Sequence, residues 1–175
     1  LNKNLFQNKN IRKVFHNAIY DVCWIRSSTG EMLKGELLDT MIAASVIDET
    51  RMKYSLDAIS KIYLNETKYK YDLTDKVKAW SDGVIQDPMT NMEKLPYSLV
   101  KDYAEQDVNL TLKLWNIFEK KLDEVLYTQY EEDEEGKKLK NKNGEYIIIA
   151  EKTSRNIFEL ETKLFPCLVD MKFKG

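Results

Sequence analysis

The stretch at residues 95–122, LPYSLVKDYAEQDVNLTLKLWNIFEKKL, carries the longest uninterrupted helical pattern in the chain. Apolar residues recur along it at steps of three and four, which is the spacing of a buried stripe on a helix. We expect this stripe to consist of Val100, Ala104, Val108, Thr111, Trp115, Phe118 and Leu122. The stretch therefore predicts one long helix that packs along one side.

A second row of residues runs beside that stripe, and it contains Tyr103 and Asp107 among Leu99, Leu110 and Leu114. Because Tyr103 and Asp107 are four residues apart, they lie one above the other on one face of the helix. An inward aspartate needs a partner, since an unpaired buried carboxylate is very costly. A metal ion, an Arg or Lys side chain, and a half-exposed cleft are the three candidates.

Composition restricts the classes of protein that need to be considered. The 175 residues are 43% hydrophobic and 32% charged, which is enough for one domain with a core and a highly charged surface. The net charge of −2 gives no overall attraction to nucleic acid, although a local basic patch would suffice. No apolar run is long enough to span a membrane, so we expect no membrane partner.

Cysteine and histidine are scarce, and this argues against two common kinds of site. Cys23 and Cys167 each lie in an apolar run, which favours buried free thiols over a disulfide. His16 is the only histidine. A structural zinc site is therefore excluded, and a nucleophile activated by histidine would have to use His16.

The first half of the chain shows two short strand patterns, near Val14 and near Leu37. Asn17 follows the first and is a good N-cap residue for a helix that carries Ile19, Cys23 and Trp24 on one face. Asp21 then lies in the first turns of that helix, where the helix dipole favours a carboxylate. Asp39 follows the second strand and is most simply the N-cap of the next helix.

Residues 65–80 are rich in lysine and contain Tyr69 and Tyr71. This mixture is compatible with a surface that faces nucleic acid, where aromatic rings stack on bases and lysines meet phosphates. A solvated helix face explains it equally well, and both readings stay open.

Beyond residue 126 the composition changes. An acidic run at residues 131–135 precedes Asn143-Gly144, a strong signal for a hairpin between two extended segments. The last segment, residues 156–171, has a helical apolar stripe, and Pro166 predicts a kink or a restart there. The expected stripe consists of Ile157, Leu160, Leu164, Leu168 and Met171.

Two pairs of residues carry a resemblance to a known family. Asn17 with Asp21, and Tyr103 with Asp107, resemble the second and third motifs of the 3′–5′ proofreading exonuclease domain of family A DNA polymerases, of phage type. The tyrosine is typical of the DEDDy subtype. The resemblance covers residues 11–126 and 156–175. It implies a division into a partial exonuclease domain at 1–126, an acidic loop and β-hairpin insertion at 127–155, and a helix at 156–175 that leads into a polymerase domain.

The resemblance implies an α/β, RNase H-like (DnaQ-like) fold, which would be partial here and dominated by helices. The family's first motif, Asp-x-Glu, lies on a strand far upstream of the second motif, but residues 1–16 contain no acid. We therefore expect a chain truncated at its N-terminus. A sheet without its first strands would expose apolar surface, so the chain would self-associate, repack its helices, or be covered by upstream residues.

The resemblance also implies a mechanism. Two divalent ions, Mg²⁺ or Mn²⁺, would lie about 4 Å apart and stabilise phosphodiester hydrolysis at a single-stranded DNA 3′ end. Asp107 would bind one ion and Asp21 the other. Tyr103 would orient the attacking water, and Asn17 would position the primer end. With two of four carboxylates present, we expect little or no nuclease activity from these 175 residues, and a location in the cytoplasm of a bacterial or phage-infected host.

Other functions compete with this interpretation. A non-catalytic DNA-binding scaffold would have the fold without the complete site. An RNA exonuclease similar to RNase D would share the two motifs but not the tail around Phe165 and Pro166. A purely structural helical domain would leave the two inward acids unexplained.

Overall fold

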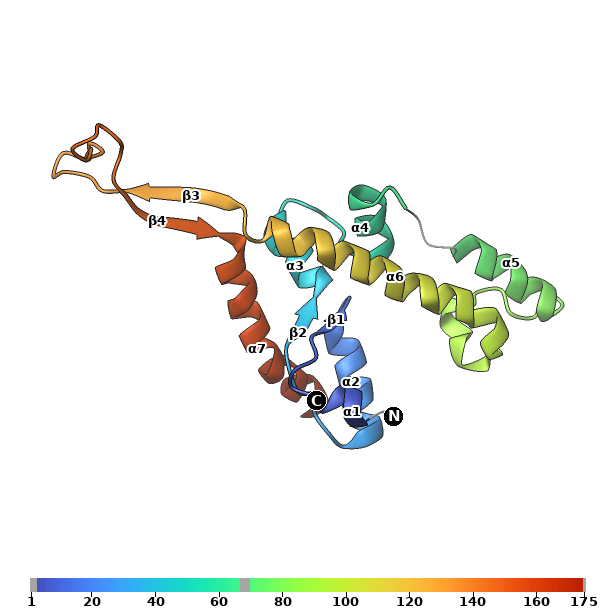
Figure 1. Ribbon diagram of the computed structural model, residues 1–175. Coiled ribbons are helices and arrows are strands. Elements are labelled where there is room, and N and C mark those ends of the chain that lie inside the picture. The colour runs from blue at the N-terminus through green and yellow to red at the C-terminus, as the bar shows by residue number, and fades with distance from the viewer. Residues whose placement is uncertain (1–2, 67–69, 175) are drawn as a thin grey trace. The chain divides into compact units, whose positions relative to one another are not determined.

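The computed structural model describes residues 3–66 and 70–174, and it divides the chain into two compact units (Figure 1). Unit 1 consists of residues 1–51 and 117–175, and unit 2 consists of residues 52–116. Tyr69, one of the two tyrosines considered for nucleic-acid contact, lies outside the described residues.

Unit 1 contains the strands predicted near Val14 and Leu37. Strand β1 (Lys13–Phe15) pairs in parallel with β2 (Leu37–Asp39), and Phe15 is the register partner of Asp39. Helix α2 (Ala18–Thr29) follows β1, and helix α3 (Thr40–Ile47) follows β2. Both helices therefore begin at the same edge of the paired strands.

The segment before β1 contains a short helix, α1 (Lys3–Phe6), and is held by a buried lysine. Lys13 is 7% exposed, and its ammonium donates to the carbonyls of Asn8, Ile11 and Lys34 at 2.6–2.9 Å. Gly35 lies against the same segment with φ 92°, and a Cβ there would approach the Ile11 carbonyl to 2.9 Å. A buried ammonium is tolerated here because all three of its protons have acceptors.

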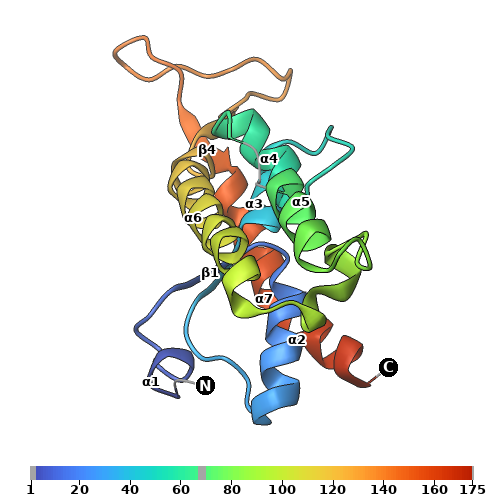
Figure 2. The same cartoon turned by 90° about the vertical axis from the view of Figure 1, so that its right-hand side faces the viewer.

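The core of unit 1 forms where helix α7 (Ser154–Lys174) packs against α2 and α3 (Figures 1 and 2). Its buried members are Ala18, Val22, Leu33, Phe165 and Val169. One prediction was wrong here: Cys167 is exposed rather than buried, although both cysteines are free thiols. Trp24, on the apolar face expected for α2, is 61% exposed. The buried face of α2 is centred on Ala18 and Val22 instead.

Helix α7 buries a different face from the one predicted. Phe158, Phe165 and Val169 are buried, whereas the five residues of the expected stripe are 42–68% exposed. Of the two alternatives predicted at Pro166, a kink or a restart, the restart is wrong, since one helix runs through this residue. Ion pairs fix the two ends of α7: Arg155 pairs with Asp123 at 2.8 Å, and Asp170 pairs with Arg26 of α2.

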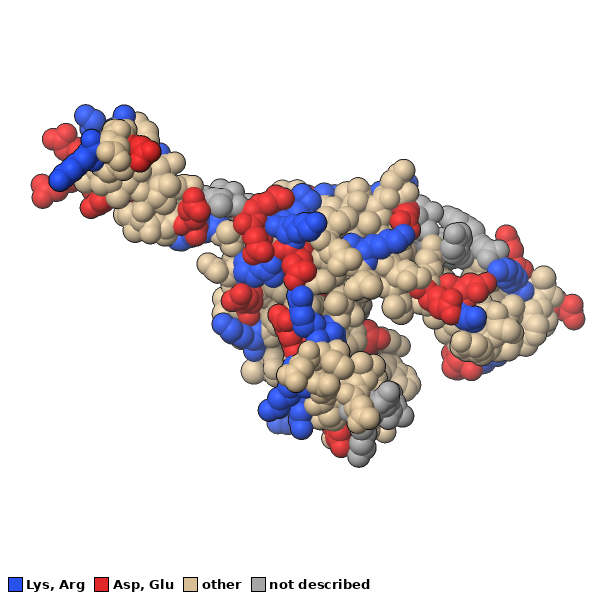
Figure 3. Space-filling model, in the orientation of Figure 1, with Lys and Arg blue, Asp and Glu red and all other residues tan. Residues whose placement is uncertain are grey.

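An antiparallel hairpin joins helix α6 (Tyr97–Lys121) to α7. Strand β3 (Val125–Tyr130) pairs with β4 (Ile148–Thr153), and the residues between them carry further bridges, Glu132 with Lys138 and Lys140 with Tyr146. Gly144 has φ 84°, as the predicted Asn-Gly turn requires. Residues 131–146 are all exposed, and Figure 3 shows basic and acidic side chains mixed at this end of the hairpin.

Unit 2 contains helix α4 (Leu56–Tyr63), helix α5 (Lys70–Trp80), the 3₁₀ helix η1 (Met89–Lys94) and the first part of helix α6 (Tyr97–Lys121). Helix α4 begins at Ser55, whose hydroxyl accepts from the Ala58 amide. The long helix predicted at residues 95–122 is confirmed as α6.

The buried face of α6 differs from the predicted stripe in its first half. Ala104 is exposed and Val108 is 68% exposed, so they do not belong to the core. From residue 110 onward the predicted stripe and the second row are both buried, as Leu110, Leu114, Trp115, Phe118 and Leu122. The two rows adjoin on the helix, so the core covers a face wider than either.

The described residues form a mixed α/β, helix-rich structure. In the part of the chain that the structure describes, no helix is both long and apolar enough to cross a membrane. The elements that carry the candidate site residues are the β1–α2 junction in unit 1 and helix α6 in unit 2.

Candidate functional site

The β1–α2 junction places Asn17 at the start of helix α2. Asn17 is exposed and has φ 64° and ψ 53°, in the left-handed region. Asparagine tolerates this region better than most residues, because its short polar side chain can bond locally. The predicted N-cap position is correct, but the Asn17 side chain makes no capping hydrogen bond.

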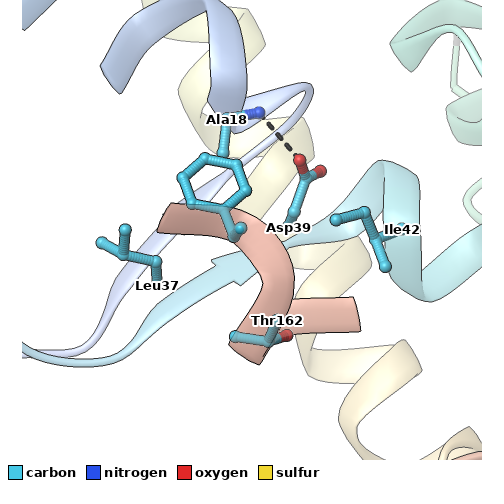
Figure 4. A pocket seen from close by; sticks show the side chains of 6 residues that line it. Ala18, Leu37, Asp39, Ile42 and Thr162 are labelled. Atoms are coloured by element: carbon cyan, nitrogen blue, oxygen red, sulfur yellow. Dashed lines mark hydrogen bonds between the residues drawn. The ribbon is translucent and has the colours of Figure 1, made fainter. Parts of the chain in front are cut away.

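Asp39 supplies the cap that Asn17 does not. Its carboxylate accepts from the backbone amides of Asn17 at 3.0 Å and Ala18 at 2.8 Å, and from the Met41 amide at 2.8 Å. The predicted cap of α3 is thus confirmed, and the same carboxylate also caps α2. Figure 4 shows Asp39 reaching across to the Ala18 amide. Hydrogen bonds from amides to an ionised carboxylate are among the strong ones.

Thr40, the next residue, adds a second set of contacts to the same junction. Its hydroxyl donates to the Phe15 carbonyl at 2.9 Å and lies 2.9 Å from His16 Nδ1. Because the hydroxyl proton is used by the carbonyl, the hydroxyl oxygen accepts from His16, which assigns the proton to Nδ1. Thr40 is fully buried, so these contacts are shielded from solvent.

Asp21 lies one turn into α2, four residues after Asn17, and is half-buried. Burial raises the pKa of its carboxyl, and the negative charge of Asp39 raises it further, while a hydrogen bond to its own backbone amide opposes both. A carboxylate whose charged form is disfavoured in this way gains from a nearby cation. The raised pKa is therefore compatible with the predicted role of Asp21 as a ligand of a cation.

Tyr103 and Asp107 lie on α6 in unit 2, and both are half-buried. The prediction that this row points inward is confirmed, since Leu110 and Leu114 on it are buried and Asp107 Oδ1 is shielded from solvent. Thr111 donates its hydroxyl to the Asp107 carbonyl at 2.7 Å, which closes the following turn. The opposite face of α6, with Ala104, Glu105, Val108 and Asn109, lines only a shallow open depression.

The structure places the four predicted site residues in two pairs. Asn17 is the N-cap of α2 and Asp21 lies in its first turn, in unit 1, whereas Tyr103 and Asp107 share α6 in unit 2. Asp21 and Asp107 offer the hard oxygen ligands that divalent ions such as Mg²⁺ prefer. Within residues 3–66 and 70–174, no group of three or more acidic, His or Cys side chains is suited to hold a metal ion. The carboxylate oxygens thus fit a divalent cation, but the described residues do not provide enough ligands to complete its coordination shell.

The residue that the sequence interpretation missed is Asp39 in its second role. It lies at one side of a small pocket lined also by Ala18, Leu37, Ile42, Thr162 and Phe165 (Figure 4). The available signal was the position of Leu-Asp-Thr at the end of a strand that had to pair with the strand before Asn17. Helix α7 contributes Thr162 and Phe165 to this pocket, so it packs beside the junction.

Comparison with known proteins identifies the class of this chain. A family model described as 3′-5′ exonuclease matches residues 1–123, which is more than half of the chain. The chain belongs to this exonuclease family, the one found in family A DNA polymerases, and the predicted resemblance is confirmed.

Its relatives are DNA polymerases, several of them from phages. The chain is 26% identical over 173 residues to the DNA polymerase DpoZ of Acinetobacter phage SH-Ab 15497, which covers 98% of this chain and 23% of that polymerase. It is 33% identical over 115 residues to DpoZ of Vibrio phage phiVC8, covering 58% and 18%. It is 37% identical over 86 residues to DNA polymerase I of Borreliella burgdorferi, covering 49% and 8%. The chain thus spans less than a quarter of the length of these relatives.

Proposed function

We propose that this chain is the 3′–5′ exonuclease part of a DNA polymerase and that its complete site removes nucleotides from a single-stranded DNA 3′ end. The observation that carries the proposal is the location of both motif pairs inside the matched span: Asn17 with Asp21 at the start of α2, and Tyr103 with Asp107 on one face of α6.

Asp21 and Asp107 are the residues of this chain that would hold the divalent ions, Mg²⁺ or Mn²⁺. Bound there, such ions supply charge stabilisation for the attacking and the leaving oxygen of the phosphodiester. The raised pKa of Asp21, caused by burial and by the charge of Asp39, supports this assignment, because a cation would relieve both effects.

Tyr103 and Asn17 would act on the substrate side. Tyr103 lies one helical turn before Asp107. Its hydroxyl would accept a hydrogen bond from the water that attacks the phosphorus and would thereby orient that water. Asn17 presents an exposed amide at the start of α2 and would hydrogen-bond the primer end. Both residues position reactants, so they would contribute mainly through orientation.

The 175 residues by themselves would have little or no nuclease activity. Residues 1–20 contain no Asp or Glu, so the Asp-x-Glu ligands that the family carries upstream of Asn17 are not supplied by this sequence. Loss of two of four carboxylates lowers metal affinity severely, because each Mg²⁺ relies on several hard oxygen ligands.

The division of the chain follows the same proposal. Residues 1–126 would belong to the exonuclease domain, residues 127–155 would be an insertion, and the helix at residues 156–175 would lead toward a polymerase domain. The exposure of residues 131–146 supports the second of these assignments, since they contribute nothing to the core of unit 1.

A direct assay tests the proposal. The chain is incubated with a 3′-labelled single-stranded DNA and with either Mg²⁺ or Mn²⁺, beside Asp107→Ala as the matched variant. We expect no trimming above the variant. Robust trimming that disappears in Asp107→Ala would show that the present carboxylates suffice and would overturn the proposed inactivity.

A non-catalytic DNA-binding scaffold is the second candidate, favoured by the lack of a three-ligand group among the described residues. Supplying the Asp-x-Glu segment separates the two candidates. An exonuclease would gain metal-dependent trimming, whereas a scaffold would bind DNA without cutting it.

A further inference from the structure

Two consecutive residues, Asp39 and Thr40, form hydrogen bonds through their side chains with each of residues 15–18 at the β1–α2 junction. Parallel pairing brings Asp39 beside Phe15, at the point where β1 and β2 both end. After Phe15 and Asp39, backbone hydrogen bonds between the strands cannot hold the two segments together, because each segment continues into its own helix. Side chains must then supply the connection.

Asp39 holds the junction from one side. It is 7% exposed, and its two carboxylate oxygens accept three backbone amide protons, those of Asn17, Ala18 and Met41. Three charge-assisted bonds to fixed amides leave the carboxylate little freedom to coordinate anything else. Asp39 is therefore occupied with the backbone, whereas Asp21 is the carboxylate left to meet a ligand.

Thr40 holds the junction from the other side. Its hydroxyl accepts from His16 and donates to Phe15, which are the two residues just before Asn17. The contacts of Asp39 and Thr40 thus cover residues 15–18 without a gap. This run includes the left-handed Asn17, a conformation that a surrounding structure must fix because it is sparsely populated.

We propose that Asp39 and Thr40 are positioning residues, a clamp that fixes the start of helix α2 and thereby the placement of Asn17 and Asp21 in the exonuclease site. The clamp itself is independent of any activity, and only its purpose rests on the proposed function. Neither residue touches substrate or metal in this scheme.

The first test measures hydrogen exchange of individual amides by NMR in the 175-residue chain. In Asp39→Ala we expect the amides of Asn17 and Ala18 to exchange about tenfold faster or more, because a bond to a charged acceptor is lost at each. Ser55→Ala is the matched control. It removes a helix cap in unit 2 and is expected to speed exchange at Ala58 alone.

A conservative pair tests Thr40 by a spectroscopic signature. Thr40→Ser keeps the hydroxyl, and His16 should retain its Nδ1 proton, which the ¹⁵N shifts of the imidazole report. Thr40→Val has the same shape without the hydroxyl, so the tautomer should change. A clamp that acts only through packing would leave the tautomer unaffected in both variants.

A third measurement tests the purpose of the clamp, using Mn²⁺ alone as the probe. We expect Mn²⁺ to broaden the amide signals around Asp21 in the chain and in Thr40→Ser, and to broaden them at least severalfold less in Thr40→Val, whose charge is unchanged. Asp21→Asn should abolish the broadening.

The outcomes separate the two ideas. Unchanged exchange at Asn17 and Ala18 in a folded Asp39→Ala overturns the clamp whatever the protein does. Altered exchange and tautomer without any Mn²⁺ broadening at Asp21 in the original chain upholds the clamp and contradicts the metal-binding role of Asp21. If Asp39→Ala does not fold, Asp39→Asn is used instead, because it keeps the shape of the side chain but places an amide donor against one of the backbone amides. Unchanged exchange at the amides of Asn17, Ala18 and Met41 in that variant would overturn the clamp.

Discussion

Asn17 combines two demands at a single residue. It has a left-handed backbone with φ 64°, and it carries the amide proposed to meet the primer end. For a residue with a Cβ and no local polar group, this conformation costs roughly 1–2 kcal/mol. The effect of the backbone conformation and the effect of the side-chain amide can therefore be separated by the choice of the residue that replaces Asn17.

Substitutions at Asn17 should follow the backbone. We expect Asn17→Ala to lower the free energy of unfolding by about 1 kcal/mol, and Asn17→Gly to leave it nearly unchanged, since glycine adopts positive φ at no steric cost. Urea unfolding followed by circular dichroism measures both. Equal losses in the two variants would contradict the assignment of strain to this position.

Asp21 gives a pH dependence with a defined sign. Burial raises the pKa of its carboxyl in the folded state, so the folded chain holds this proton more tightly than the unfolded chain. Stability from this group is present below the unfolded pKa and is lost as the pH rises through the folded pKa. With EDTA present, Asp21→Asn should therefore increase the free energy of unfolding at about pH 8 and change it little at about pH 4.

Asp123 is the matched control with the opposite sign. A hydrogen bond from Arg155 lowers the pKa of the Asp123 carboxyl, so its contribution is present at neutral pH and is lost as the pH falls through that lowered pKa. Asp123→Asn should destabilise the fold at about pH 8. If Asp21→Asn also destabilises the fold at about pH 8, the charged form of Asp21 is not disfavoured in the folded chain.

The sequence pointed to the proposed site residues more readily than to the residues that support them. Asn17, Asp21, Tyr103 and Asp107 stay predictions; they were chosen because each pair, at its spacing along the chain, resembles a motif of the family. The second role of Asp39 depends on the register between β1 and β2, whose paired residues are 24 apart in the sequence, and spacing along the chain does not determine that register. The carboxylate also forms a local cap, which by itself explained its presence.

At the level of elements, α7 is the clearest case in which pattern and packing diverge. Its sequence carries two apolar rows, and the one with more leucines is the exposed one. Periodicity identifies an apolar row but not the partner that covers it. Here α7 packs against α2 and α3, with Phe165 and Val169 in the core beside Ala18 and Val22. For the same reason, both rows of α6 become buried only after residue 110.

The two faces of α7 should respond differently to substitution. Leu164 is 46% exposed and Phe165 is 4% exposed. We expect Leu164→Glu to change the free energy of unfolding by less than about 0.5 kcal/mol, as for other surface positions. Phe165→Ala should cost about 3–5 kcal/mol, because it empties a core site. The reverse order in urea unfolding would mean that α7 buries the leucine row.

The outer part of the hairpin, residues 131–146, is exposed and contributes no residue to the core of unit 1. Replacing residues 131–147 with an Asn-Gly turn should leave the stability of unit 1 unchanged or raise it by up to about 2 kcal/mol, because a shorter connection costs less closure entropy. Thermal unfolding measures the effect. A clear loss of stability would contradict the description of these residues as an insertion outside the core.

For the whole molecule, the sequence predicted the class and the proportion of helix, and the family match confirms the class. The two short strands and the caps of α3 and α4 were within reach of local rules. The division into two units was not, since it depends on which parts of α6 find partners and not on any break in the helical pattern.

The central claim is that Asp21 and Asp107 are half of a metal-dependent exonuclease site. The most direct measurement fuses a family segment that carries the Asp-x-Glu motif to the N-terminus of this chain and follows trimming of 3′-labelled single-stranded DNA and RNA with Mg²⁺ or Mn²⁺. Asp57→Asn, at an exposed acid on α4, is the matched control.

We expect the fused chain to trim DNA from its 3′ end only with the metal present. The rate should fall on the order of 100-fold in Asp107→Ala and in Asp21→Ala, as when one charge-stabilising group is lost, and should be unchanged in Asp57→Asn. A folded fusion that binds DNA without trimming it, that trims only RNA, or that trims equally well in Asp107→Ala would contradict the account.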